Sequence, residues 1–188
     1  MKIKNSISLI LASGVLFSGY AAASEDYLFD SNATLDGKKA LTAGTQEFGL
    51  QGDVNFDYAD DFLVNLQGSY GYFIVDNFLL GGDASLSVSD NVQTYKVGVF
   101  GEYNFDFGSK FVPYVGAGAQ FLYSKYFSNS DTSMNMKSAI GVKYFIAENI
   151  AVTTEVNYNI ANDDLYVGAN GNAKNTNTNV MIGTRYYF

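Results

Sequence analysis

The chain has 188 residues, a net charge of −8, 19 Gly, 15 Tyr and 15 Phe, and it contains no cysteine and no histidine. The acidity excludes nucleic acid as a partner, because binding to phosphates needs clustered Lys and Arg side chains. Without cysteine there are no disulfides, so packing and backbone hydrogen bonds alone must hold the fold.

The first residues have the composition of a secretory signal. Lys2 and Lys4 give a basic start, residues 7–17 form an apolar run, and residues 21–23 are three alanines. This run is too short for an ordinary membrane-spanning helix, and the alanines fit a signal-peptidase site. We predict a cleaved signal peptide over residues 1–23 and therefore export from the cytoplasm.

The rest of the chain divides into a short leading segment and one domain. Residues 24–42 show no clear alternation, and we expect an N-terminal segment in the periplasm there. Insertion of part of this segment into the following domain is the alternative. No later stretch offers about 18 uninterrupted apolar residues, so no transmembrane helix is predicted. We expect a β-barrel domain over residues 43–188.

Apolar and polar residues alternate in segment after segment of this domain. In "EFGLQGDVNF", Phe48, Leu50 and Val54 alternate with Glu47 and Asp53. A period of two is the period of a β-strand. We predict eight strands, near residues 47–56, 62–72, 80–88, 95–105, 115–123, 136–146, 150–160 and 177–188.

The links between these segments differ in length. Tight turns are predicted near residues 75–77, 106–110 and 147–149, short links at 57–61 and 89–92, and long loops at 125–135 and 161–176. In outer-membrane barrels, short turns face the periplasm and longer loops face outward. The second half of the chain follows this pattern.

Alternation alone fits either a soluble sandwich or a membrane barrel. Aromatic side chains decide between them, because they gather near both ends of the apolar strand faces with aliphatic residues between. Those near the turns are Tyr72, Tyr103, Phe105, Tyr144, Tyr186 and Phe188; those near the loops are Phe56, Tyr58, Phe62, Tyr95, Tyr123 and Tyr158. Two aromatic girdles are typical of the two interfaces of a bilayer. The predicted fold is all-β: an eight-stranded antiparallel up-and-down transmembrane β-barrel with short periplasmic turns.

Four segments carry a family resemblance: "GYFIVDNFLLGGDASLS", "FVPYVGAGAQF", "GVKYFIAENIAVTTEVNY" and the closing "GTRYYF". With them the chain resembles the small eight-stranded outer-membrane barrels, which include the OmpA transmembrane domain, OmpX-like, OmpW-like and opacity-type surface proteins. The resemblance implies a surface-exposed, monomeric protein of the Gram-negative outer membrane, in contact with outer-membrane lipid and lipopolysaccharide. It implies either a structural and surface-interaction role with a side-chain-filled lumen, or an OmpW-like narrow channel for small or apolar solutes.

The closing segment places Phe188, Tyr186 and Ile182 on one strand face and Arg185 on the other. In the resembled family, a terminal Phe preceded by alternating apolar residues looks like the recognition signal for the outer-membrane assembly machinery. We therefore assign an assembly signal to Phe188, Tyr186 and Ile182. The alternative is that these residues only contribute to an aromatic girdle.

The polar strand faces carry charges of both signs, which we expect to form a charge network in the lumen. Its members are Glu47, Asp53, Asp83, Lys96, Glu102, Lys137, Lys143, Glu155 and Arg185. Folding the strands onto their turns predicts Asp83 diagonal to Lys96, Lys143 diagonal to Glu155, and Phe100 opposite Gly116. Charges inside a dry lumen must be paired. The pairs form either a fixed plug or a gate that rearranges to pass ions.

The residues for catalysis are few. Lipid-modifying and proteolytic outer-membrane enzymes generally use histidine, which is missing here. Ser85 is expected opposite Lys96, and a Ser–Lys pair can act as nucleophile and base. However, neither an oxyanion hole nor a third group is visible in the sequence. We predict a protein that is not an enzyme and uses no cofactor and no metal.

Overall fold

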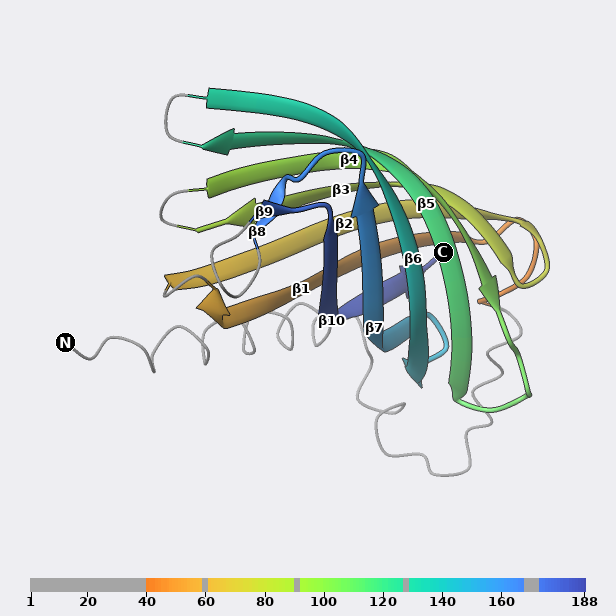
Figure 1. Cartoon of the computed structure of the whole chain (residues 1–188). Helices are drawn as coiled ribbons and strands as arrows, with labels where there is room; N and C mark the ends of the chain where they lie inside the picture. The colour runs from red at the N-terminus through yellow and green to blue at the C-terminus, as the bar shows by residue number, and fades with distance from the viewer. Residues whose placement is uncertain (1–39, 59–60, 90–91, 127–128, 168–172) are drawn as a thin grey trace.

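The computed structural model describes residues 40–58, 61–89, 92–126, 129–167 and 173–188. Eight strands form a closed barrel in the order β1-β10-β7-β6-β5-β4-β3-β2 (Figure 1). They are β1 (Gln46–Tyr58), β2 (Asp61–Val75), β3 (Phe78–Val88), β4 (Val92–Asn104), β5 (Phe111–Tyr126), β6 (Asn129–Ala147), β7 (Ile150–Ala161) and β10 (Thr176–Tyr187).

All neighbouring strands of the barrel are antiparallel, and β1 pairs with β10 to close it. The predicted fold, an eight-stranded antiparallel barrel, is therefore confirmed. A separate two-stranded hairpin, β8 (Tyr166–Val167) with β9 (Ala173–Lys174), lies in the connection between β7 and β10. Within the described residues, no helix is long and apolar enough to cross a membrane.

Tight turns mark one end of the barrel, which we call the turn end. Residues 76–77, 105–110 and 148–149 connect successive strands there, as the sequence predicts. Asn77 takes the left-handed conformation, with a φ of 66°, that such a turn needs and that Asn tolerates. The N–H of Gln46 donates to the carbonyl of Phe188 across 2.8 Å at the same end. The opposite end, which carries the β8–β9 hairpin, is called the loop end.

The predicted loop over residues 125–135 is wrong. β5 continues to Tyr126 and β6 begins at Asn129, and the two strands stay in register throughout this region. The run "SNSDTSMN" is polar, which is why it resembles a loop. Its alternation nevertheless continues, since Ser133 is buried while Met134 is exposed. The predicted connection over residues 161–176 is long, as expected, but contains the β8–β9 hairpin.

The apolar face of each strand points outward. Along β7, Glu155 and Asn157 are buried while Val156 and Tyr158 are nearly half exposed. The predicted girdle residues Tyr72, Tyr103, Phe105, Tyr144, Tyr186, Phe188, Tyr95, Tyr123 and Tyr158 are all exposed. The side chains of Phe56, Tyr58 and Phe62 lie outside the described part of the structure. This polarity is that of a membrane barrel, with a polar interior and an apolar surface for lipid.

A small apolar cluster fills the interior at the turn end, and we call it the turn-end plug. Its residues are Ala40, Leu41, Phe73, Leu79, Val112, Phe145, Ala151 and Tyr187. Residues 40 and 41 belong to the segment expected in the periplasm, yet both are buried. The carbonyl of Leu41 accepts a hydrogen bond of 2.7 Å from the N–H of Asn77. The end of this segment is therefore part of the barrel's packing, and residues 24–39 lie outside the described chain.

The interior is packed tightly enough that one methyl group matters at Gly141. A Cβ atom there would lie 2.5 Å from the hydroxyl oxygen of Tyr114, which is buried. We expect Gly141→Ala to displace this ring and to lower the free energy of unfolding by about 1–3 kcal/mol, the usual cost of overpacking. Urea unfolding in lipid vesicles, followed by gel mobility with and without boiling, measures the change.

The matched control is Gly68→Ala, since a Cβ at Gly68 meets nothing within 4 Å. We expect it to change stability by less than about 0.5 kcal/mol. Equal losses of stability in the two variants would contradict the packing shown around Gly141.

Candidate functional site

Five charged side chains from five strands meet in the middle of the lumen. They are Glu47 from β1, Glu102 from β4, Lys143 from β6, Glu155 from β7 and Arg185 from β10, and we call them the inner charge network. All five are buried. Each lies on the inward face of its strand because side chains on a strand alternate between the two faces. The barrel thereby brings together residues far apart in the chain.

Lys143 lies at the centre of this network. Its Nζ donates to Glu47 Oε2 across 2.7 Å and to Glu102 Oε1 across 2.5 Å. The ammonium group also lies 5.1 Å from the centroid of the Tyr114 ring and 5.7 Å from that of Tyr187. The side chain has no exposed surface. A lysine buried so completely is tolerated because carboxylates and ring faces surround its charge.

Arg185 connects the other carboxylates of the network. Its Nη1 donates to Glu47 Oε1 across 2.7 Å and to the Ser69 hydroxyl across 3.1 Å. Its Nη2 lies 3.5 Å from Glu155 Oε2 and 3.9 Å from Glu102 Oε2. The planar guanidinium offers several donors in fixed directions, so one side chain can orient three acids. Among the residues that the structure describes, its Nε has no hydrogen-bond partner.

Neutral side chains donate further hydrogen bonds to the carboxylate of Glu155. Gln51 Nε2 donates to its Oε1 and the Tyr114 hydroxyl to its Oε2, each across 2.8 Å. Lys137 Nζ lies 3.7 Å from Glu155 Oε1 and also 3.7 Å from Asp83 Oδ2. Lys137 thus connects Glu155 of the inner charge network to Asp83, which lies nearer the loop end. Contacts of 3.7 Å are ion pairs without a close hydrogen bond.

The lumen beyond Lys137, toward the loop end, is lined by amides. Asn135 donates to Gln120 Oε1 and to Asn159 Oδ1, each across 2.9 Å, and Gln120 donates to Asp83 Oδ2 across 2.5 Å. The Tyr166 hydroxyl, from the β8–β9 hairpin, donates to Asn135 Oδ1 across 2.8 Å. We call this part the outer chamber. Its cavity measures about 20 Å³, and another beside the inner network about 10 Å³. Each is at most about the size of one water molecule.

The family follows from the extent of the sequence match. The family model described as the outer membrane protein beta-barrel domain matches residues 9–187. The chain belongs to this family. Membership in it places the barrel in the outer membrane, with its apolar face in lipid.

Two solved outer-membrane barrels share the fold. The chain is similar to the N-terminal β-barrel domain of OprF from Pseudomonas aeruginosa, with 20% identity and a TM-score of 0.59 over 78% of this chain and 98% of that one. It is also similar to Neisserial surface protein A, with 17% identity and a TM-score of 0.55 over 77% and 96%. At such identities the likeness shows the fold alone. Among curated proteins, no sequence matches the chain.

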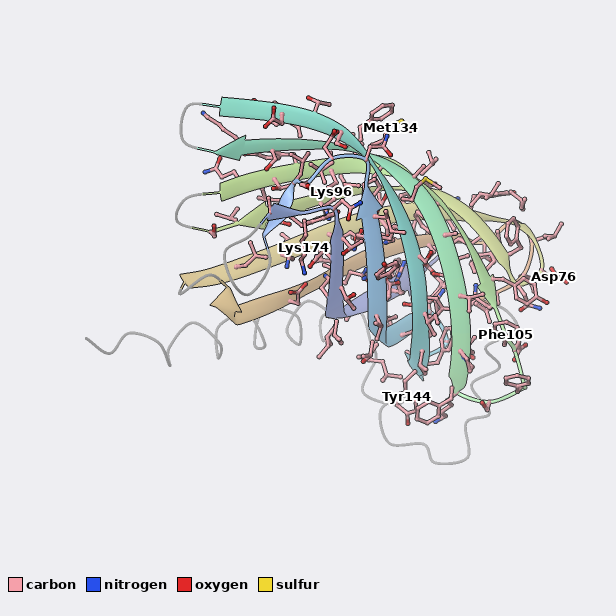
Figure 2. All side chains as sticks on the ribbon, viewed as in Figure 1. Asp76, Lys96, Phe105, Met134, Tyr144 and Lys174 are labelled. Carbon is pink, nitrogen blue, oxygen red and sulfur yellow. The ribbon has the colours of Figure 1, made fainter. Side chains whose placement is uncertain are left out.

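Of the nine charges assigned to the lumen of this family member, seven join one connected set of ion pairs. Asp53 and Lys96 do not. Asp53 accepts hydrogen bonds from Asn65 and Asn179 instead, across 2.9 and 3.0 Å. Lys96 makes no ion pair within the described chain, and its Nζ lies 5.1 Å from the centroid of the Tyr166 ring. Figure 2 shows Lys96 near the β8–β9 hairpin, while Met134 and Tyr144 point away from the barrel.

The predicted diagonal placements of Asp83 with Lys96 and of Lys143 with Glu155 are confirmed by the register, but the ion pairs expected from them are wrong. Asp83 and Lys96 are diagonal in the register, but Asp83 pairs with Lys137. Lys143 and Glu155 are also diagonal, but Lys143 pairs with the two glutamates of β1 and β4.

Phe100 pairs with Gly118 and not with Gly116, and its ring lies against Gly81 of β3. Long side chains reach across this narrow lumen as readily as along its wall, so the neighbouring strand does not determine the partner.

No separate signal in the sequence points to the neutral partners Gln51, Ser69 and Tyr114. Each of these three residues lies on an inward-facing position, but its neutral side chain does not stand out from the other polar residues of the strand faces. Within the described residues, no group of three or more His, Cys, Asp or Glu side chains could hold a metal ion.

Of the predicted assembly-signal residues, Ile182 and Tyr186 lie on the outward face of the turn-end half of β10, and Phe188 follows the end of the strand with its side chain exposed. The rings of Tyr186 and Phe188 stack with centroids 5.7 Å apart. This placement makes them accessible from lipid. Their recognition by the assembly machinery stays a prediction.

Removing the central lysine tests the network. We expect Lys143→Met to lower the free energy of unfolding by about 3–5 kcal/mol, because Glu102 then keeps only its 3.9 Å contact with Arg185 and stays buried. Urea unfolding of the barrel in lipid vesicles measures the loss.

Combining Lys143→Met with Glu102→Gln should recover part of this stability, because the double change removes one charge of each sign. A double variant as unstable as the single one would show that Lys143 acts through packing and not through its charge.

Proposed function

We propose that the protein is a structural barrel of the outer membrane whose lumen is closed and whose loop end contacts other molecules at the cell surface. The observation that carries the proposal is the Lys143 ammonium, fully buried between Glu47 and Glu102. A side chain held by two charge-assisted hydrogen bonds in a low-dielectric interior resists displacement by a passing solute.

Two further layers support closure. The turn-end plug lies on the periplasmic side of the inner charge network and contains the ring of Phe145 packed 5.3 Å from that of Tyr187. On the other side, Tyr166 contacts Asn135 above the outer chamber. A solute would have to displace all three layers, and the two small cavities described above each have room for about one water molecule.

A narrow channel is the second candidate. The two ion pairs of Lys137, each 3.7 Å long, are looser than those of Lys143. The outer chamber next to them is lined by amides that could solvate a small solute. A rearrangement of Arg185 and Lys143 among the carboxylates would then have to open the lumen. The short contacts of Lys143 favour the closed barrel.

No catalytic role belongs to the proposal. Ser85 lies directly opposite Lys96 in the register, as the sequence predicts. Within the described chain, however, the two side chains make no hydrogen bond with each other, and Lys96 faces the Tyr166 ring. A serine needs a base within hydrogen-bond reach to become a nucleophile.

The proposed partners follow from the exposed surfaces. We expect the apolar face to contact outer-membrane lipid and lipopolysaccharide, and Phe188, Tyr186 and Ile182 to be read by the assembly machinery during insertion. We expect a monomer, exported with the help of a signal over residues 1–23.

Conductance across a planar bilayer tests closure. We expect the refolded full-length barrel to give no stepwise openings, because Lys143 and the turn-end plug block the lumen. Lys143→Ala removes the ammonium and leaves space and two acids that attract water, so we expect brief cation-carrying openings from this variant.

Gel mobility with and without boiling verifies that each sample is folded before it is measured. Lys110→Ala, at the turn end and outside the network, serves as the control and should stay silent. Regular openings of the unsubstituted barrel would overturn the proposal in favour of the channel.

A further inference from the structure

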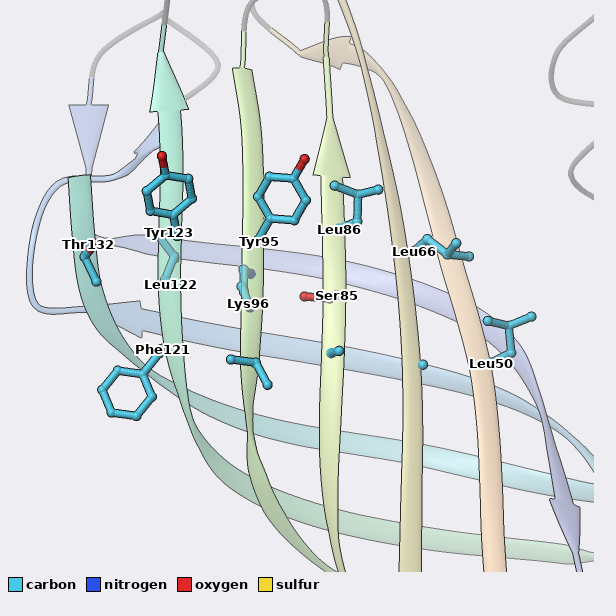
Figure 3. A pocket seen from close by; sticks show the side chains of 13 residues that line it. Leu50, Leu66, Ser85, Leu86, Tyr95, Lys96, Phe121, Leu122, Tyr123 and Thr132 are labelled. Carbon is cyan, nitrogen blue, oxygen red and sulfur yellow. The ribbon is translucent and has the colours of Figure 1, made fainter. Parts of the chain in front are cut away.

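The outward face of the barrel is hollowed at one place. A groove of about 490 Å³ runs across β1 to β6 in the half nearer the loop end, and we call it the outer groove (Figure 3). Leu50, Leu66 and Leu86 line one side of it, and Tyr95, Val97 and Phe121 the other. Its volume is within the range of small-molecule pockets, about 300–1,000 Å³.

Two small residues form the floor of the outer groove. Gly68 pairs with Leu50 on one side and with Ala84 on the other, and Ala84 pairs with Val97. Large side chains therefore flank two positions where the surface is only backbone or a methyl group. A Cβ atom at Gly68 would meet nothing within 4 Å, so this glycine is not required by close packing of its own chain.

The loop-end side of the groove is polar. The rings of Tyr95 and Tyr123 lie 6.4 Å apart between their centroids, on paired positions of β4 and β5. Two residues further toward the loop end, Gln93 and Lys125 are directly paired and both exposed. The surface thus changes from aliphatic to phenolic to amide and ammonium over a short distance along two adjacent strands.

The position of the outer groove along the barrel determines which part of the bilayer it contacts. The turn end of an outer-membrane barrel faces the periplasm, so the loop end faces outside and the outer groove lies in the outer leaflet. Tyrosines mark the level of the lipid headgroups, below which hydrocarbon begins. An occupant must therefore offer a thin apolar chain below this level and an anionic, hydrogen-bonding group above it to complement Lys125.

We propose that the outer groove binds one acyl chain of a lipid A molecule, the anionic glycolipid of the outer leaflet, and that Lys125 contacts one of its phosphates. A polymethylene chain fits between Leu50 and Phe121 over the Gly68–Ala84 floor. A second barrel fits less well, because two convex barrels touch along a line and would leave this hollow unfilled. The proposal depends on the outer-membrane location and is independent of whether the lumen conducts.

Native mass spectrometry of the refolded full-length barrel in detergent, titrated with purified lipid A, tests the proposal. The groove is filled by Gly68→Leu, whose added atoms have free space. Lys125→Ala removes the phosphate contact. The matched controls are Ala117→Leu, on the exposed face of β5 outside the groove, and Lys110→Ala at the turn end.

We expect the unsubstituted barrel and both controls to retain one lipid A molecule that Gly68→Leu loses. Lys125→Ala should weaken retention about fivefold, the usual effect of one lysine near an anionic lipid.

Equal retention by Gly68→Leu would overturn the proposal. Equal retention of phosphatidylglycerol would overturn the choice of lipid A, and a dimer that Gly68→Leu dissociates would assign the groove to a second copy. Because all variants keep the inner charge network, these outcomes leave the closed-lumen proposal to its own conductance test.

Discussion

The pairing of the Lys143 ammonium with the carboxylates of Glu47 and Glu102 is the contact on which the interior depends. Backbone hydrogen bonds fix each strand only against its two neighbours. Lys143 instead connects β6 to β1 and β4, which lie elsewhere around the wall. A barrel that turns its apolar face to lipid must place its polar groups inside, and buried charges there are stable only when matched. The ion pairs thus connect strands that are not neighbours and stabilise the barrel across its lumen.

The interior is layered along the axis because its chemistry changes with distance from the turn end. Apolar side chains, including Leu41, close the turn end, the inner charge network follows, and the amides of Gln120, Asn135 and Asn159 fill the region toward the loop end. Water can enter most easily from the amide side, since amides exchange hydrogen bonds with water at little cost. On that side the Tyr166 hydroxyl contacts Asn135, and on the other side the turn-end plug lies between the inner charge network and the end of the barrel.

The strands could be predicted from sequence because a period of two depends only on the chain itself, as along β7 from Ile150 to Ala161. The residue that each side chain faces on the neighbouring strand could not be predicted, because this pairing depends on the exact residues at which each turn folds. Asn104 pairs with Tyr114 around a turn in which the Asp106 carboxylate accepts from the N–H of Gly108 across 2.8 Å. Placing this turn one residue earlier moves Phe100 by two positions, from Gly118 to Gly116. Contacts across the lumen, such as Lys143 with Glu47, depend in addition on the closure of all eight strands.

The closing seam of the barrel is its least extensive pairing. β1 and β10 are in register only from Glu47 with Tyr187 to Gly52 with Ile182, and beyond this point the Asn179 amide reaches Asp53 across 3.0 Å. These strands are the most distant in sequence, so their meeting carries the largest loop-closure cost of any strand pair in the barrel. Until they meet, two strand edges remain unpaired in hydrocarbon, where each bare N–H and C=O is costly. This short seam is therefore the place where we expect the finished barrel to open first.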